Sequence, residues 1–137
     1  MPKPRLFHLM ALAQHRLEKT TDAAFRPIGI SGAQLGVLFI LEKNPGAMLK
    51  AVSDGLGINA SAITALIGRM EDAGLVRRQP SDDDGRAVHL FATADGLAKI
   101  AAVKPVLARL NTRLTADFSE REIATIARFL DAILERF

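Results

Sequence analysis

The sequence predicts a mainly α-helical protein with one small β-hairpin. Three observations support this fold class. Apolar residues recur every three to four positions through most of the chain, as they do on amphipathic helices. Residues 75–80 and 86–93 instead alternate in character and contain β-branched and aromatic side chains, which is typical of two paired strands. Breaker clusters such as "NPG" at residues 44–46 separate the segments.

The first two helices are bounded by recognisable start and stop signals. The first helix is expected from about Pro4 to Phe25, because Pro27 and a following glycine interrupt the apolar stripe. A second helix should begin at Ser31, since Gln34 three residues later completes a capping box. It should end at the "NPG" cluster.

Two further helices precede the hairpin. A short one is expected over about Lys50–Leu56, after an extended Met48–Leu49. The next should begin after Asn59, which is a good N-cap, and end at Gly74, a good residue for the position that follows a helix.

Two long helices follow the hairpin. Thr93 is placed to cap a fifth helix from Ala94 to about Thr115, which Pro105 should bend. Ser119 and Glu122 form another capping box, which opens a last helix reaching Phe137. The order is four helices, a hairpin and two helices.

Composition restricts the function classes. A length of 137 residues suits a single domain spanning 1–137, and the net charge of +3 permits an anionic partner without requiring one. The absence of Cys excludes disulfides, thiolate metal sites and thiol redox sensing. Three dispersed histidines do not predict a metal site, so no metal or cofactor is expected. No Ser/His/Asp set is brought together by the predicted fold, so no catalytic residue is expected and the protein should not be an enzyme.

The N-terminus does not resemble a signal peptide, because polar residues break its apolar run and no small-residue cleavage site follows. No segment has the roughly 18 apolar residues that span a membrane. The sequence therefore predicts a cytoplasmic protein without a membrane partner.

The layout of residues 31–93, three helices followed by a hairpin, is that of a winged helix-turn-helix, with the hairpin as the wing. In the third of these helices, one stripe should be buried: Ile63, Leu66, Ile67 and Met70. The opposite face carries Ser61, Ala65, Gly68 and Asp72, with Ala62, Thr64 and Arg69 on its flanks. Such a smooth face suits a DNA major groove, where Ser and Thr read base edges and Ala contacts thymine methyls. The alternative is that small residues stand here because nothing selects against them.

The tip of the hairpin combines an acidic run with an arginine. Asp84 lies two residues before Arg86, so its carboxylate is placed to brace the guanidinium. A braced arginine on a narrow hairpin suits the DNA minor groove, whose negative potential attracts it. The alternative is a solvated turn.

The chain resembles the MarR family of bacterial transcriptional regulators. The resemblance rests on "LGINASAITALIGRMEDAGLVRR", "DDDGRAVHLFATADG" and "LTADFSEREIATIARFLDAIL", which cover residues 56–78, 82–96 and 114–134. Its most specific parts are the Asp84-x-Arg86 wing pattern and the Thr-x-x-Gly start of the next helix, from Thr93 to Gly96.

The resemblance implies a homodimeric, sequence-specific regulator of transcription, expected to be a ligand-responsive repressor on a pseudo-palindromic double-stranded operator. Residues 1–30 and 94–137 would form the dimerisation helices on either side of the winged helix-turn-helix at 31–93. The base-facing positions would be Ser61, Ala62, Thr64 and Ala65, and Arg86 would enter the minor groove. Candidate phosphate contacts are Lys50, Arg69, Arg77 and Arg78, of which one or two are expected to form salt bridges in the fold instead.

This chain departs from the family pattern at Ala65, where a longer polar side chain is common, at Gly68, where an acidic one is common, and at Gly85, where a second arginine is common. We therefore expect fewer direct base contacts and one wing charge less.

Many members of the family bind small aromatic or phenolic effectors in a cleft beside the dimer helices. The residues here that could line such a cleft are His8, Leu12, His15 and Arg16. The alternative is that the two histidines lie at an interface or face solvent. A different function for the whole fold is a winged-helix protein–protein interaction module, which would not show the steep salt dependence of phosphate contacts.

Overall fold

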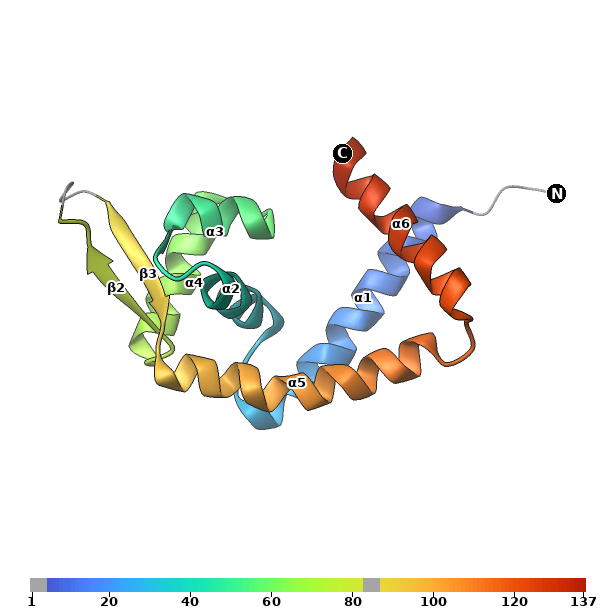
Figure 1. Cartoon of the computed structure of the whole chain (residues 1–137), viewed down its shortest axis with the longest axis horizontal. Coiled ribbons are helices and arrows are strands. Elements are labelled where there is room, and N and C mark those ends of the chain that lie inside the picture. Colours follow the sequence, from blue (N-terminus) through green and yellow to red (C-terminus); the bar gives the residue numbers. More distant parts are fainter. Residues whose placement is uncertain (1–4, 83–86) are drawn as a thin grey trace. The chain divides into compact units, whose positions relative to one another are not determined.

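The computed structural model describes residues 5–82 and 87–137. It divides into two compact units, Met1–Val103 and Lys104–Phe137. The described residues contain six α-helices, one short 3₁₀ helix and three strands. Figure 1 labels the α-helices and the two longer strands. The predicted fold class, mainly helical with a β-hairpin wing, is confirmed. The assignment of the whole chain to one domain, with divisions after residues 30 and 93, stays a prediction.

The first two helices have the expected boundaries. Helix α1 spans Leu6–Phe25 and continues into the 3₁₀ helix η1, Arg26–Ile28. Helix α2 spans Gly32–Lys43, and both hydrogen bonds of its capping box form. The Ser31 hydroxyl accepts from the Gln34 N–H at 3.1 Å, and the Gln34 side chain accepts from the Ser31 N–H at 3.0 Å.

The segment before the third helix differs from its prediction. Leu49 is the first residue of helix α3, Leu49–Leu56, rather than extended. The two residues before it form strand β1, Ala47–Met48, which pairs with β3. Sequence periodicity misses such a strand because two residues are too few to show an alternation.

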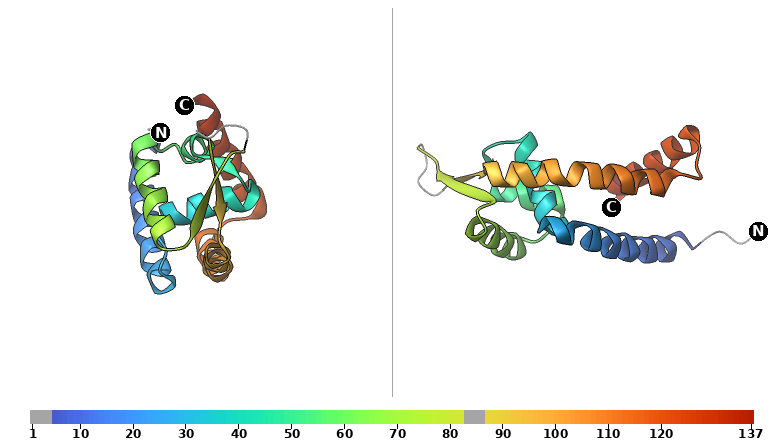
Figure 2. Two further views of the ribbon diagram at one scale, coloured as in Figure 1. Left: turned by 90° about the vertical axis from the view of Figure 1, so that its left-hand side faces the viewer. Right: turned by 90° about the horizontal axis from the view of Figure 1, so that it is seen from below.

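Helix α4 and the hairpin confirm their predictions. Helix α4 spans Ala60–Asp72, with the Asn59 side chain accepting from the Ala62 N–H. Gly74 follows it with a φ of 76°, which favours glycine. Strands β2, Val76–Pro80, and β3, Val88–Ala92, form a three-stranded antiparallel sheet with β1 in the order β1-β3-β2. Beyond α4, the two longer strands project as a twisted ribbon (Figure 2).

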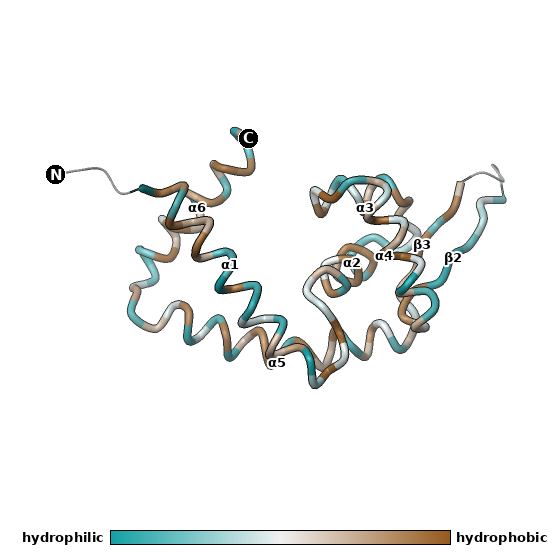
Figure 3. The backbone as a smooth tube through the Cα atoms, turned by 180° about the vertical axis from the view of Figure 1, so that it is seen from behind, coloured by the Kyte–Doolittle hydropathy of each residue, from teal (hydrophilic) through white to brown (hydrophobic). Residues whose placement is uncertain are grey.

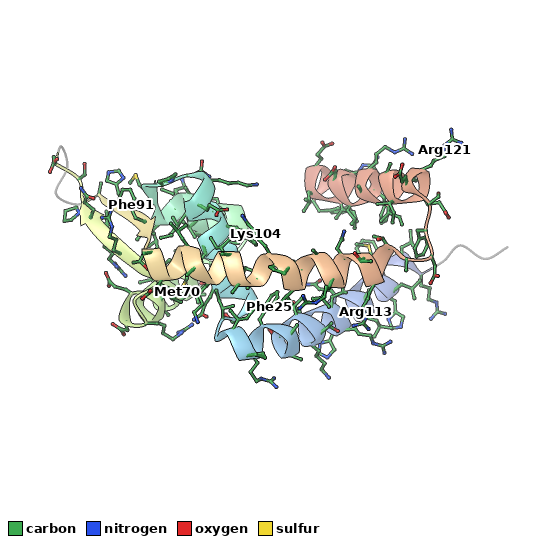
Figure 4. All side chains as sticks on the ribbon, turned by 60° about the horizontal axis from the view of Figure 1, so that its bottom comes forward. Phe25, Met70, Phe91, Lys104, Arg113 and Arg121 are labelled. Carbon is green, nitrogen blue, oxygen red and sulfur yellow. The ribbon has the colours of Figure 1, made fainter. Side chains whose placement is uncertain are left out.

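The core lies entirely in the first unit. It is formed by apolar side chains of α2, α3, α4, the sheet and the start of α5, together with Phe25 at the end of α1 and the connecting residues Ile30 and Leu75. Figure 3 shows hydrophobic colour through α2, and Figure 4 labels Phe25 and Met70. The predicted α4 stripe is confirmed, because its four members are all buried: Ile63, Leu66, Ile67 and Met70.

The Thr-x-x-Gly pattern joins the end of α4 to the start of α5. Helix α5 spans Ala94–Thr115, as predicted. The Thr93 hydroxyl accepts from the Gly96 N–H at 3.1 Å and donates to the Gly74 carbonyl at 2.6 Å. A Cβ atom on Gly96 would lie 2.3 Å from the Leu75 carbonyl oxygen, so only glycine fits here. The pattern therefore has a structural role.

The second unit contains the rest of α5 and helix α6, Glu120–Arg136. The predicted capping box forms, and the hydrogen bonds from the backbone and hydroxyl of Ser119 lower the pKa of Glu122. This cap is fully formed above the usual Glu pKa and is lost as the pH falls through the lowered value. Pro105 lies within α5; the predicted bend stays a prediction. No residue of 104–137, all of which are described, is buried.

None of the individual helices in residues 5–82 and 87–137 combines the length and the apolar composition that a membrane span requires.

Candidate nucleic-acid interface

Helix α4 presents the predicted outward surface. The four residues expected to face bases are all exposed: Ser61, Ala62, Thr64 and Ala65. Arg69, on the flank of this surface, is exposed as well. A Cβ atom added at Gly68 would meet nothing within 4 Å. The surface is therefore uncharged and low in relief through its first two turns.

The two hydroxyl groups on this surface each donate a hydrogen bond within the protein. Ser61 Oγ donates to Asn59 Oδ1 at 2.9 Å, and Thr64 Oγ1 donates to the Ala60 carbonyl at 2.8 Å. Each oxygen keeps lone pairs with which to accept a further hydrogen bond. In a major groove, such acceptors complement the amino groups of adenine and cytosine.

The two arginines of β2 have different surroundings. Arg78 Nε lies 3.3 Å from the Glu71 carboxylate of α4, in a half-exposed ion pair. The Arg77 guanidinium lies 4.3 Å from the centre of the Phe91 ring and donates to Gln79 at 3.1 Å. Phe91, labelled in Figure 4, is directly opposite Arg77 on β3. Arg78 is thus one of the candidates engaged within the fold, as expected for one or two of them.

Strand alternation could have separated these arginines in advance. Val76 is buried, so Arg78, two residues later, shares its inward face, whereas Arg77 points outward.

Lys50 and Arg69 are the remaining candidate phosphate contacts. Both are exposed, and neither forms an ion pair with another described residue. Their charges are available to a partner.

Asp84 and Arg86 lie outside the described residues, and so does Gly85. The proposed bracing of the wing arginine therefore stays a prediction from the sequence.

The residues expected to line an effector cleft lie along α1, and their side chains are exposed: His8, Leu12, His15 and Arg16. Their role stays a prediction. Within residues 5–82 and 87–137, no three His, Asp or Glu side chains gather in a way that could hold a metal ion.

Comparisons with known proteins agree with this geometry. A family model described as the MarR family matches residues 28–87. The chain is similar to the HTH-type transcriptional repressor IacR of Pseudomonas putida, with 26% identity over 93% of this chain and 76% of that protein. It is also similar to the HTH-type transcriptional repressor Rv2887 of Mycobacterium tuberculosis, with 32% identity over 73% of this chain and 75% of the repressor.

Among solved structures, a mutant MarR from E. coli complexed with operator DNA superposes with a TM-score of 0.87 at 24% identity, covering 94% of this chain and 93% of that one. The fold, the matched segment and the relatives agree: this chain belongs to the MarR family of transcriptional regulators.

Proposed function

We propose that this protein is a homodimeric transcriptional repressor that binds a pseudo-palindromic operator, with α4 in the major groove and the wing at the minor groove. One observation carries the proposal: α4 is held by a buried stripe, while Ser61, Ala62, Thr64 and Ala65 form an exposed, uncharged surface beside Arg69, which forms no ion pair with another described residue. Similarity to named repressors supports the direction of regulation. Its place of action would be the cytoplasm, where bacterial DNA lies.

The second unit supports the homodimer. Helix α6 carries apolar side chains at helical spacing that are exposed in the single chain, among them Ile126, Phe129, Leu130 and Leu134. Exposed apolar patches of this kind mark association surfaces. A second copy would cover this face and hold two α4 helices about one DNA turn apart, roughly 34 Å.

Fluorescence anisotropy tests the proposal. The protein is titrated against its own upstream DNA and against a scrambled duplex, at two salt concentrations. Tight binding to the upstream DNA alone, weakened steeply by salt, is expected because phosphate contacts release counterions. Equal binding to both duplexes, or no binding, would move the function toward a protein partner.

Arg69→Ala should weaken binding to operator and scrambled duplexes alike and reduce the slope of log affinity against log salt by about 1, as expected for the loss of one phosphate contact. The matched variant is Arg78→Ala, whose guanidinium is held by Glu71. We expect this control to leave the slope unchanged. An equal change of slope in both variants would show that the Arg78–Glu71 pair opens on DNA.

Arg86→Ala should weaken operator binding by about 1–3 kcal/mol, if the wing arginine makes a groove contact as the sequence predicts. Anisotropy titration measures the loss, and circular dichroism checks the fold. Arg86→Lys keeps the charge but loses the planar fork, so it separates a groove contact from a simple charge effect. Unchanged affinity in a folded Arg86→Ala protein would remove the wing from the interface.

A further inference from the structure

Lys99 joins α5 to the segment between α1 and α2. Its Nζ donates to the carbonyl oxygen of Ile28, the last residue of η1, although the two are 71 residues apart in the sequence. Both residues are half-buried. No carboxylate in the described part of the chain forms a salt bridge with Lys99, so the contact joins a cation to a backbone carbonyl.

The end of η1 is a site that suits a cation. Carbonyl groups at the end of a helix lack intrahelical donors and carry the negative end of the helix dipole. The Gly29 N–H bonds the carbonyls of Phe25 and Arg26, and Lys99 supplies the donor for that of Ile28.

Gly29 lies directly beside the ammonium group of the lysine. Its φ of 79° lies in the left-handed region that favours glycine. A Cβ atom at this position would lie 3.3 Å from Lys99 Nζ, which is a tight contact. The turn that ends η1 therefore also leaves room for the ammonium group.

This contact connects the segment by which the chain enters the winged helix-turn-helix with the helix by which it leaves. Helix α1 enters the winged helix-turn-helix through η1, and α5 leaves it after β3. Lys99 connects the entering segment to the leaving one, so it restrains how α1 is set against the DNA-binding elements of the same unit.

We propose that Lys99 is a positioning residue that fixes the separation of half-sites the dimer accepts. The inference rests on the proposed function, because α1 must belong to the dimerisation region for its setting to determine where α4 lies on each half-site. When the Lys99–Ile28 hydrogen bond is intact, it holds the two α4 helices of the dimer at one separation. Without this hydrogen bond the two helices sample several separations, and DNA binding must then restrict them to one, which costs conformational entropy.

The experiment compares Lys99→Met, which keeps a long unbranched stem without a charge or donor, with Lys99→Arg, which keeps both. Lys43→Met is the matched control, an exposed lysine at the end of α2. Each protein is titrated against the operator, against duplexes whose half-site spacing is changed in single base-pair steps, and against a duplex with one half-site. Thermal unfolding verifies that each variant is folded. If Lys99→Met does not fold, Lys99→Gln, which keeps a neutral donor, replaces it.

Lys99→Met is expected to weaken binding to the full operator by about five- to tenfold, within the usual range for coupling between sites. It should also flatten the dependence of affinity on spacing while half-site affinity stays within about twofold, a split that a loss of DNA contact would not produce. Lys99→Arg and Lys43→Met should keep the wild-type spacing profile.

An unchanged spacing profile in Lys99→Met, or equal losses on the half-site and the full operator, would overturn the positioning role. Wild-type protein that binds none of the duplexes specifically would instead overturn the proposed function, so the two failures are distinguishable.

Discussion

Gly96→Ala is expected to lower the free energy of unfolding by about 3 kcal/mol, the upper part of the range for overpacking a well-packed site. The added Cβ would lie 2.3 Å from the Leu75 carbonyl oxygen and 2.9 Å from Leu38 Cδ2. Moving this carbonyl away would break a hydrogen bond, because it accepts the Thr93 N–H at 3.0 Å. Urea denaturation followed by circular dichroism measures the change.

Gly68→Ala is the matched control. The same substitution on α4 meets nothing within 4 Å, so it should raise the free energy of unfolding by about 0.5–1 kcal/mol through helix propensity. Both variants are compared at one protein concentration, since dimerisation would contribute to apparent stability. Equal effects of the two substitutions would contradict the close approach at Gly96.

Ala65→Glu is expected to weaken operator binding by about 2 kcal/mol, roughly 30-fold, because it places a carboxylate in the major groove, within the negative potential of the flanking phosphates. Ala65 is exposed near the middle of α4, so the fold should accept the longer side chain. Anisotropy titration gives the loss in affinity, and thermal unfolding shows that stability is retained.

Ala65→Gln separates charge from size at the same position. Glutamine matches glutamate in shape but is neutral, so we expect its affinity to stay within about threefold of the wild type, a difference below 1 kcal/mol. Equal losses for Glu and Gln would mean that the groove excludes any longer side chain. Wild-type affinity for Ala65→Glu would place this face of α4 away from DNA.

Local signals predicted the helices well. Ser31, Asn59 and Ser119 each cap the helix they were expected to cap, because a capping hydrogen bond reaches only two or three residues along the chain. The buried stripe of α4 followed from the helical period alone. The outward face of that helix was therefore predictable as well.

Contacts between distant segments were not predictable. Strand β1 exists because Ala47 and Met48 lie against Leu90 and His89, more than forty positions away. The Lys99–Ile28 hydrogen bond likewise leaves no local pattern. The pairing of Arg78 with Glu71 is a partial exception, because strand alternation from the buried Val76 already distinguishes Arg78 from Arg77.

The absence of any buried residue in 104–137 has a consequence for gene dosage. If these helices find their core only against a second copy, as proposed, the protein that occupies an operator is present in proportion to the square of the free monomer concentration. Below the dimer dissociation constant, halving the supply of chain would leave about a quarter of the dimer by mass action. Two cells that hold unequal amounts of the protein would then differ in dimer concentration by up to the square of the ratio of their chain concentrations.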